Sequence, residues 1–230
     1  MKNSSLFTFF MVLLLGLGGC IGDDIIQDEI DPVLRIMNPV DTIEINTSYQ
    51  YEATYFNNVG QQEANSITWT SSDESIVSID ADGVATANEI GNVTVRAETT
   101  TPDGLVLSEE STVVVGNSTV IVNEARTGSL ETTTFYTLDG DFTLEDDGDI
   151  LVLSFAENYS TSSGLPGLYI YLTNNPNSIA GAFEIGRVDI FNGAHTYEID
   201  AGLVGLTDYE FVLYFCKPFN VKIGAGQFDN

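Results

Sequence analysis

The sequence predicts an all-β protein with two β-sandwich domains in series behind a short N-terminal leader. Ten tyrosines, thirteen phenylalanines and many Val, Ile and Thr residues favour strands. Apolar and polar residues alternate in short runs, and Gly, Asn and Asp separate these runs as turns. No sustained helical period follows residue 20, and the remaining length suits one or two domains.

Residues 1–19 form the predicted leader. Lys2 precedes an apolar run from Leu6 to Leu17, which is shorter than the roughly 20 residues that cross a bilayer and has the length of a signal-peptide core. The run ends in Leu17-Gly18-Gly19-Cys20, which resembles the bacterial lipobox. The resemblance implies cleavage before Cys20, a diacylglyceryl group on its sulfur and an acyl chain such as palmitate on its amine. The alternative is an ordinary secretory signal with a cysteine there by chance.

Lipidation would make the membrane a partner of the protein, because stable attachment needs two or more anchoring signals. The sulfur of Cys20 would be consumed, so Cys216 would be the only thiol of the mature chain. Residues 20–31 form a predicted tether with five acidic residues and no basic one. This cluster resembles the surface-export signal of some Gram-negative lipoproteins, which implies an outer-membrane lipoprotein exposed at the cell surface. A merely polar linker is the alternative.

The composition excludes several function classes. The chain has 34 acidic and seven basic residues and a formal net charge of −27. A field of this sign repels phosphate backbones, so we expect no nucleic-acid partner. The single histidine, His195, excludes catalytic triads and histidine-rich metal sites by count, and we expect it to face solvent near the start of a strand. The sequence indicates no catalytic residue, no metal site and no cofactor.

An acidic run at residues 139–149 contains six Asp and Glu residues. Their spacing differs from that of the twelve-residue calcium loop. Calcium binding at a carboxylate-rich turn stays open, and the expected structure is an acidic hairpin loop.

Residues 32–116 form the first predicted domain. Within 92–99, Val93, Val95 and Ala97 alternate with polar residues, which is the period of a half-buried strand. Strands are expected at 33–37, 48–56, 67–70, 76–80, 84–87, 92–99 and 105–115. About seven short strands are typical of an immunoglobulin-like sandwich. Trp69 is expected in the core, with a sugar-stacking platform as the alternative.

The motifs of this domain resemble the bacterial Ig-like domain of group two. The tryptophan strand holds Trp69, and the turn Ser71-Ser72-Asp73 follows it. The segment Val77–Ala87 includes Asp80, Gly83 and Val84, and the later strand Val93–Ala97 follows Gly91. The resemblance implies a surface stalk or adhesion module and no catalyst.

Residues 117–230 form the second predicted domain, after a polar break at 115–119. Apolar runs at 149–155, 168–172 and 209–216 predict strands, and turns are expected at 164–167 and 174–177. These features favour a second β-sandwich or a closed barrel.

The order of motifs in the second domain resembles the domain named electron transfer DM-thirteen. The matching segments are Arg126-Thr127-Gly128, Leu151–Phe155, Leu165-Pro166-Gly167, Leu168–Leu172, Gly193–Ile199 and Cys216–Val221. The histidine that family members often carry near the start is missing, because residues 136–140 read YTLDG. A role that needs an imidazole there is therefore in doubt.

Cys216 is the candidate site residue of this domain. The resemblance implies a redox or electron-transfer role, which would need a thiolate favoured by positive charge from Lys217 and Lys222. A buried, inert thiol is the alternative, and His195 could pair with Cys216 only if the two meet in space. The sequence thus predicts a non-enzymatic surface lipoprotein. Either the Ig-like spacer presents a module with a surface ligand or redox partner, or the protein is adhesive or structural and Cys216 only packs.

Overall fold

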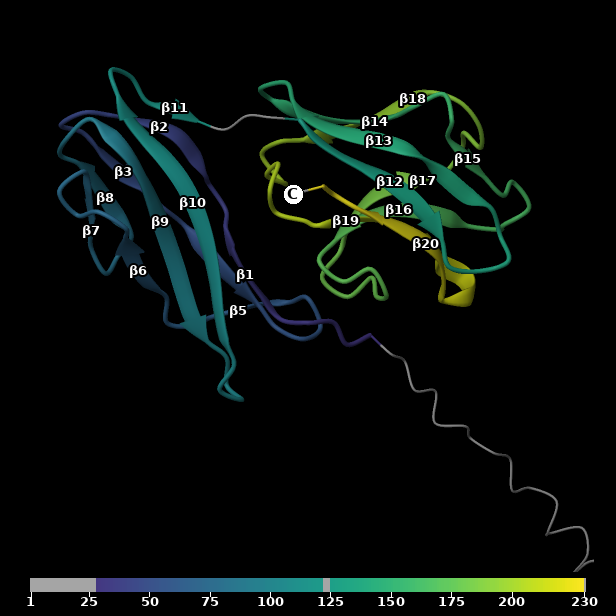
Figure 1. The fold of residues 1–230 in the computed structure, drawn as a ribbon. Coiled ribbons are helices and arrows are strands. Elements are labelled where there is room, and N and C mark those ends of the chain that lie inside the picture. Colours follow the sequence, from purple (N-terminus) through teal and green to yellow (C-terminus); the bar gives the residue numbers. More distant parts are fainter. Residues whose placement is uncertain (1–27, 122–124, 230) are drawn as a thin grey trace, which may run out of the picture.

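The structure, a computed structural model, describes residues 28–121 and 125–229 and confirms the all-β fold class (Figure 1). The one helical segment in this part of the chain is the 3₁₀ helix η1 (Lys217–Phe219). The predicted leader 1–19, Cys20 and the tether up to residue 27 lie outside the described residues.

The first domain contains strands β1 to β11 in three small sheets. The strand orders are β1-β4-β5, β11-β2-β10-β9-β6 and β3-β8-β7. The strands are β1 (Val33–Ile36), β2 (Val40–Glu44), β3 (Ser48–Gln50), β4 (Ala53–Phe56), β5 (Gln62–Glu63), β6 (Thr68–Ser71), β7 (Val77–Ile79), β8 (Val84–Ala87), β9 (Gly91–Thr100), β10 (Val106–Gly116) and β11 (Val120–Ile121).

The long hairpin β9–β10 forms the centre of this domain. Val93, Val95 and Ala97 of β9 are buried in its core, as their alternation predicted. The expected strand 48–56 is interrupted, because the Tyr51 amide donates to the Gly83 carbonyl and the Glu52 amide to the Asn38 side chain. Strands β2, β5 and β11 were not predicted. Strand β11 pairs with β2 and so extends the first domain beyond its expected end at residue 116.

The second domain is one curved antiparallel sheet around a main core, with a smaller hydrophobic cluster at Tyr171, Leu213 and Phe215. Its strand order is β17-β16-β19-β20-β12-β13-β14-β18, with β15 paired to β13. The strands are β12 (Arg126–Thr132), β13 (Leu138–Asp146), β14 (Ile150–Phe155), β15 (Ser160–Thr161), β16 (Leu168–Thr173), β17 (Phe183–Arg187), β18 (His195–Asp200), β19 (Phe211–Cys216) and β20 (Val221–Gln227).

The acidic run 139–149 is not the hairpin loop that the sequence suggested. Most of it belongs to β13, in which Leu138, Phe142 and Leu144 point into the core, while Asp139 and Asp141 are exposed. The turn itself is short, and the Asp147 amide closes it on the carbonyl of Ile150. The carboxylates therefore line the outer face of a core strand.

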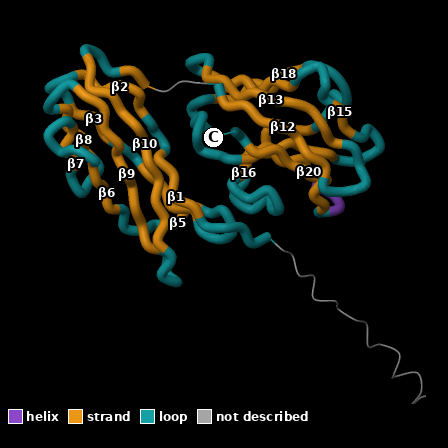
Figure 2. The backbone as a smooth tube through the Cα atoms, viewed as in Figure 1, coloured by secondary structure: helices purple, strands orange, loops and turns teal. Residues whose placement is uncertain are grey.

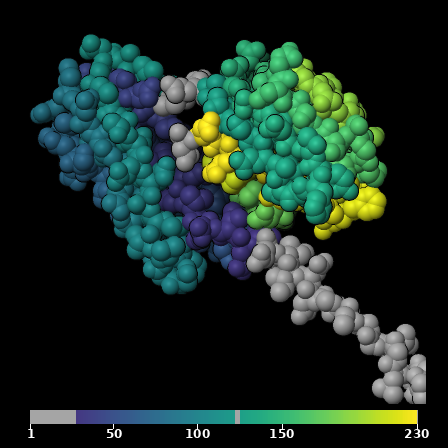
Figure 3. Space-filling model, turned by 45° about the vertical axis from the view of Figure 1, so that its right-hand side comes forward, coloured from purple at the N-terminus to yellow at the C-terminus, as the bar shows by residue number. Residues whose placement is uncertain are grey.

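The two domains lie side by side (Figures 1 and 3). Strand β2 of the first domain lies near β13 of the second at one end of the molecule, and β1 lies next to the second domain at the other (Figure 2). The start of the described chain contacts the second domain there, since the side-chain Nδ2 of Asn175 donates to the Asp28 carbonyl at 2.5 Å. The second domain thus contacts residues at the start of the described chain, beside the first domain.

Candidate functional sites at Cys216 and at the domain junction

Cys216 is the last residue of β19, between Leu168 of β16 and Val221 of β20. It is 2% exposed and belongs to the main core of the second domain. Its Sγ donates a hydrogen bond to the Pro166 carbonyl at 3.2 Å. This bond uses the thiol proton, so the protonated side chain makes it and a thiolate cannot.

An apolar cavity of about 280 Å³ adjoins the thiol. Its walls are Tyr136, Gly164, Leu165, Pro166, Phe219, Val221 and Ile223. Cys216 thus combines a very small exposed fraction with a position at the base of an apolar depression.

The two lysines that follow Cys216 in sequence have partners of their own. Lys217 Nζ lies 2.6 Å from Glu184 Oε2 and 4.9 Å from the ring centre of Tyr169. Lys222 Nζ donates to Asn177 Oδ1 at 2.9 Å. The hydrogen bond to Glu184 raises the pKa of Lys217, whereas burial lowers the pKa of Lys222. The ammonium groups of Lys217 and Lys222 therefore bind Glu184 and Asn177, and neither is bonded to the Cys216 thiol.

His195 does not face solvent as expected. Its ring stacks on Phe155 at 4.9 Å between centres and contacts Tyr159 and Tyr197 edge-on. Nδ1 lies 2.9 Å from the Gly193 carbonyl, and Nε2 is buried without a hydrogen-bond partner. His195 is therefore a member of an aromatic cluster at the β14–β18 pair, with different neighbours from Cys216.

The acidic side chains on β13 bind neighbouring polar groups. Asp141 accepts hydrogen bonds from Ser129 Oγ at 2.7 Å and from Asn158 Nδ2 at 2.9 Å, and these bonds lower its pKa. Across residues 28–121 and 125–229, no three His, Cys, Asp or Glu side chains are placed to hold a metal ion together. In the same residues we find no helix with the length and apolarity to cross a membrane.

The second notable site is the domain junction, at which Arg35 of β1 reaches into the second domain. Its guanidinium is paired with Glu210 and donates to Asn174 Oδ1 at 2.7 Å. It also donates to the Thr207 and Asp208 carbonyls and lies 4.1 Å over the ring of Phe56. Burial lowers the pKa of Arg35, and the charge of Glu210 opposes this shift.

Glu210 is shared between the domains. Its Oε1 also accepts from Arg126 Nη2 at 3.0 Å, and Arg126 donates to the Tyr209 carbonyl at 2.6 Å. The side chains of Arg35, Arg126 and Glu210 are only 11%, 14% and 15% exposed. The network is therefore buried, and each charge has an opposite partner and hydrogen bonds, which burial of a charge requires.

Further contacts connect the domains around this network. Thr207 Oγ1 donates to the Met37 carbonyl at 2.6 Å, and Asn175 Nδ2 to the Val59 carbonyl at 3.1 Å. Gly60, with φ of +73°, approaches the Asn174 carbonyl so closely that an added Cβ would lie 2.6 Å from its oxygen. Only a glycine therefore fits at this point of the junction.

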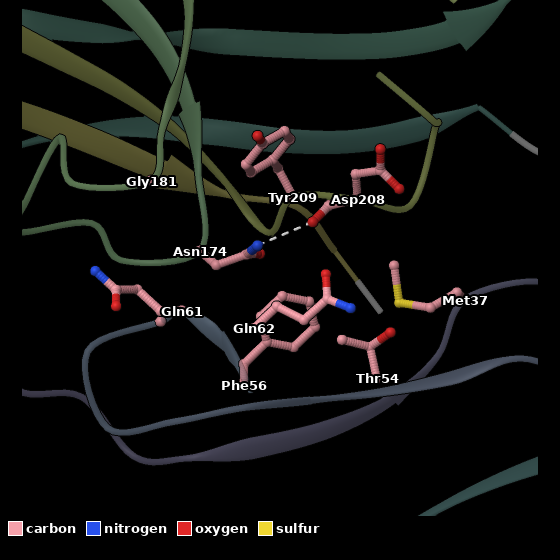
Figure 4. Close-up of a pocket in the computed structure, with 10 residues that line it drawn as sticks. Met37, Thr54, Phe56, Gln61, Gln62, Asn174, Gly181, Asp208 and Tyr209 are labelled. Atoms are coloured by element: carbon pink, nitrogen blue, oxygen red, sulfur yellow. Dashed lines mark hydrogen bonds between the residues drawn. The ribbon is translucent and has the colours of Figure 1, made fainter. Parts of the chain in front are cut away.

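Figure 4 shows a pocket of about 300 Å³ beside the network, formed by side chains of both domains. Thr54, Phe56 and Gln62 lie on one side, and Asn174 and Tyr209 on the other. The side-chain Nδ2 of Asn174 donates to the Asp208 carbonyl at 2.9 Å, and the figure draws this bond. The Asn174 side chain therefore uses both its acceptor, Oδ1, which binds Arg35, and its donor, Nδ2, at the junction.

Only weak sequence evidence points to the junction. The family resemblance involves Arg126 only as the start of a motif, and no sequence pattern marks Arg35, Asn174 or Glu210. A lone arginine in a strand usually lies at the surface, and its partner here is 175 residues away. The scarcity of basic residues, with seven in the chain, was the one usable hint.

Trp69 packs as its strand position predicted. It is half-buried against the core of the first domain, with its ring 5.7 Å from that of Tyr51. The motif turn at Ser71-Ser72-Asp73 is closed by local hydrogen bonds, including one from the Asp73 amide to Ser71 Oγ at 3.3 Å.

Comparison with known proteins places one family in this chain. No curated protein matches the chain. Among solved structures, the crystal structure of an intimin mutant from EHEC O157:H7 is similar, with 13% sequence identity and a TM-score of 0.26. That match covers 47% of this chain and 53% of the other, so the chain spans about half the length of that structure. Residues 35–106 match the bacterial Ig-like domain of group 2, and this segment of the chain is therefore such a domain, as its motifs predicted.

Proposed function

We propose that the chain is a lipid-anchored cell-surface protein of the adhesive or structural kind, in which the Ig-like domain and the second domain act as one unit. The group 2 Ig-like domain is consistent with a surface location. The leader motif ending at Cys20 supports the anchor, and the acidic residues behind it support display on the outer membrane.

The environment of Cys216 is the observation that best supports a structural role for this residue. Its side chain is 2% exposed, donates to a backbone carbonyl and packs in the main core. Reactive cysteines occupy partly exposed, electropositive surroundings, whereas the nearby Lys217 and Lys222 bind Glu184 and Asn177. Cys216 therefore acts as a small core residue.

The second candidate function is redox or ligand-binding chemistry at Cys216, as the DM-thirteen resemblance implies. The apolar cavity of about 280 Å³ beside the thiol favours it. A small apolar ligand, or a redox partner that opens this cavity, would reach the sulfur from the side of Phe219.

Thiol titration of the purified full-length protein separates the two candidates. With a packed Cys216, a thiol reagent labels one group per chain only after denaturant is added, and the visible spectrum shows no chromophore. Fast labelling at neutral pH, or a bound chromophore, would favour the redox role.

The variant Cys216→Ala tests the anchor in the same experiment, because Cys20 is then the remaining cysteine. A lipidated Cys20 leaves this variant without any thiol, even in denaturant, and intact mass shows the added acyl chains. One labelled thiol in the denatured variant would refute lipidation. Protease treatment of whole cells then tests exposure at the surface.

A further inference from the structure

Three loops meet at the end of the second domain that lies farthest from the Ig-like domain. They are residues 133–137, 162–167 and 217–222, and we call this surface the acid-free end. The Thr137 amide donates to Ser162 Oγ at 2.9 Å, and the Lys217 amide to the Gly167 carbonyl at 3.0 Å. The loops therefore lie together, and Figure 2 shows the short helical segment η1 of this end close to β20.

The charge of this surface differs from that of the rest of the chain. Its three loops contain no Asp or Glu, although the chain has 34 acidic residues. They contain two of the seven basic residues, Lys217 and Lys222. The neighbouring carboxylate of Glu184 is paired with Lys217 at 2.6 Å. An anionic surface is thus repelled by most of this protein but not by its acid-free end.

Large apolar side chains are exposed on the same loops. Phe135 is fully exposed, and Phe219, Tyr136 and Val221 are 66%, 46% and 40% exposed. Three of these four line the apolar cavity beside Cys216. A contiguous apolar surface of this kind marks a site of contact with another apolar phase or molecule.

We propose that the acid-free end docks on the interface of a lipid bilayer. Aromatic side chains favour the headgroup level of a membrane. Lysines extend their charged ends toward the headgroups while their apolar stems stay below. Phe135, Tyr136 and Phe219 supply the aromatic part of this combination, and Lys217, whose side chain is 49% exposed beside Glu184, supplies the basic part. The inference rests on the proposed lipid anchor, since the surface is too small to hold the protein at a membrane alone.

The length of chain before the described residues permits this docking. Asp28 contacts Asn175, just beyond one end of β16, and Leu168 at the other end of β16 pairs with Cys216. At about 3.3 Å per residue, these ends are roughly 23 Å apart. The eight residues from Cys20 to Asp28 reach about 26 Å when extended. An anchor at Cys20 therefore allows the acid-free end to lie on the membrane, with the Ig-like domain directed away from it.

Fluorescence quenching in lipid vesicles tests the docking. The full-length lipidated chain is prepared as Phe219→Cys, and as Leu203→Cys for a matched control. Leu203 is 69% exposed in the loop after β18, near the junction with the Ig-like domain and at the opposite end of β19 from Phe219. Each variant is labelled with bimane in the folded state and reconstituted into vesicles of phosphatidylethanolamine and phosphatidylglycerol that contain brominated lipid.

The expected result is a blue shift and quenching by brominated lipid at position 219 and neither at position 203. Vesicle flotation is measured on the same samples. Flotation without quenching at 219, or with equal quenching at both positions, overturns the docking and leaves the anchor intact. Failure to float overturns the anchor and the docking together. A blue shift at 219 that disappears on dilution, without quenching, indicates a second copy of the chain on this surface and also overturns the docking.

Discussion

Arg35 of the Ig-like domain and Glu210 of the second domain form a buried ion pair across 175 residues of sequence. The Glu210 oxygen that accepts from Arg35 also accepts from Arg126 of its own domain at 3.0 Å. One carboxylate thus connects the first strand of one domain with the first strand of the other. Because both arginines are buried with it, the junction depends on all three side chains.

Substitution of Arg35 is expected to weaken the junction. Arg35→Ala should destabilise the protein by about 2 kcal/mol, because it removes the charged hydrogen bonds between the domains while Glu210 keeps Arg126 as its partner. Calorimetry should then show two separate unfolding transitions in place of one shared transition.

Arg96→Ala is the matched control for this substitution. Arg96 lies 2.9 Å from Glu98, but both side chains are more than 40% exposed, so its loss should cost less than about 1 kcal/mol. Equal effects of the two substitutions would contradict a buried role for Arg35.

Gly60→Ala is expected to separate the domains locally. The added Cβ would lie 2.6 Å from the Asn174 carbonyl oxygen in the second domain. Gly104→Ala provides the control, because its φ of +92° carries a similar backbone cost and no atom lies within 4 Å of its Cβ. Both variants should lose about 1 kcal/mol from backbone strain, and only Gly60→Ala should speed hydrogen exchange of the Glu210 amide. Equal exchange in the two variants would count against the close approach.

The junction predicts a pH effect at Glu109. Burial and the charge of Glu210 raise the pKa of Glu109. Because the folded chain holds the Glu109 proton more tightly than the unfolded chain, the raised pKa contributes stability. This contribution is complete below the unfolded-state pKa and is lost as the pH rises through the folded-state pKa. Glu109→Gln should therefore be more stable than the natural chain at pH 7, by less than about 1 kcal/mol because the site is partly exposed. The gain should vanish near pH 4 in urea unfolding, and a gain that grows toward acid pH would refute the sign.

Cys216→Ala is expected to cost about 1–2 kcal/mol in denaturant unfolding, because it empties a well-packed core position. Adhesion of cells that display the variant should be unchanged. A variant with natural stability and lost function would instead identify the sulfur as a reactive group.

The sequence was sufficient where alternation is strict and local motifs are dense. The alternation at Val93, Val95 and Ala97 predicted β9, and the motif around Trp69 predicted an Ig-like domain that the comparisons support. The alternation of Leu138, Phe142 and Leu144 was equally regular, but the acidic residues between them favoured a loop. Charged residues on the outer face of a strand are compatible with a buried inner face.

The remaining features depend on tertiary contacts that sequence alone does not show. The strand at 48–56 is broken where the Tyr51 and Glu52 amides donate to Gly83 and Asn38, which lie elsewhere in the sequence. His195 is half-buried against Phe155 and Tyr159 of neighbouring segments. Whether Cys216 is accessible also depends on packing, here by the 164–167 turn and β20.

The central claim is that Arg35, Arg126 and Glu210 hold the two domains side by side as one unit. The most direct test is an electron spin resonance distance measurement between labels at Ile90→Cys and Leu203→Cys, which are 68% and 69% exposed on different domains. We expect one narrow distance distribution that broadens when Arg35→Ala is added. A distribution that is already broad with Arg35 in place, and that Arg35→Ala leaves unchanged, would contradict the claim.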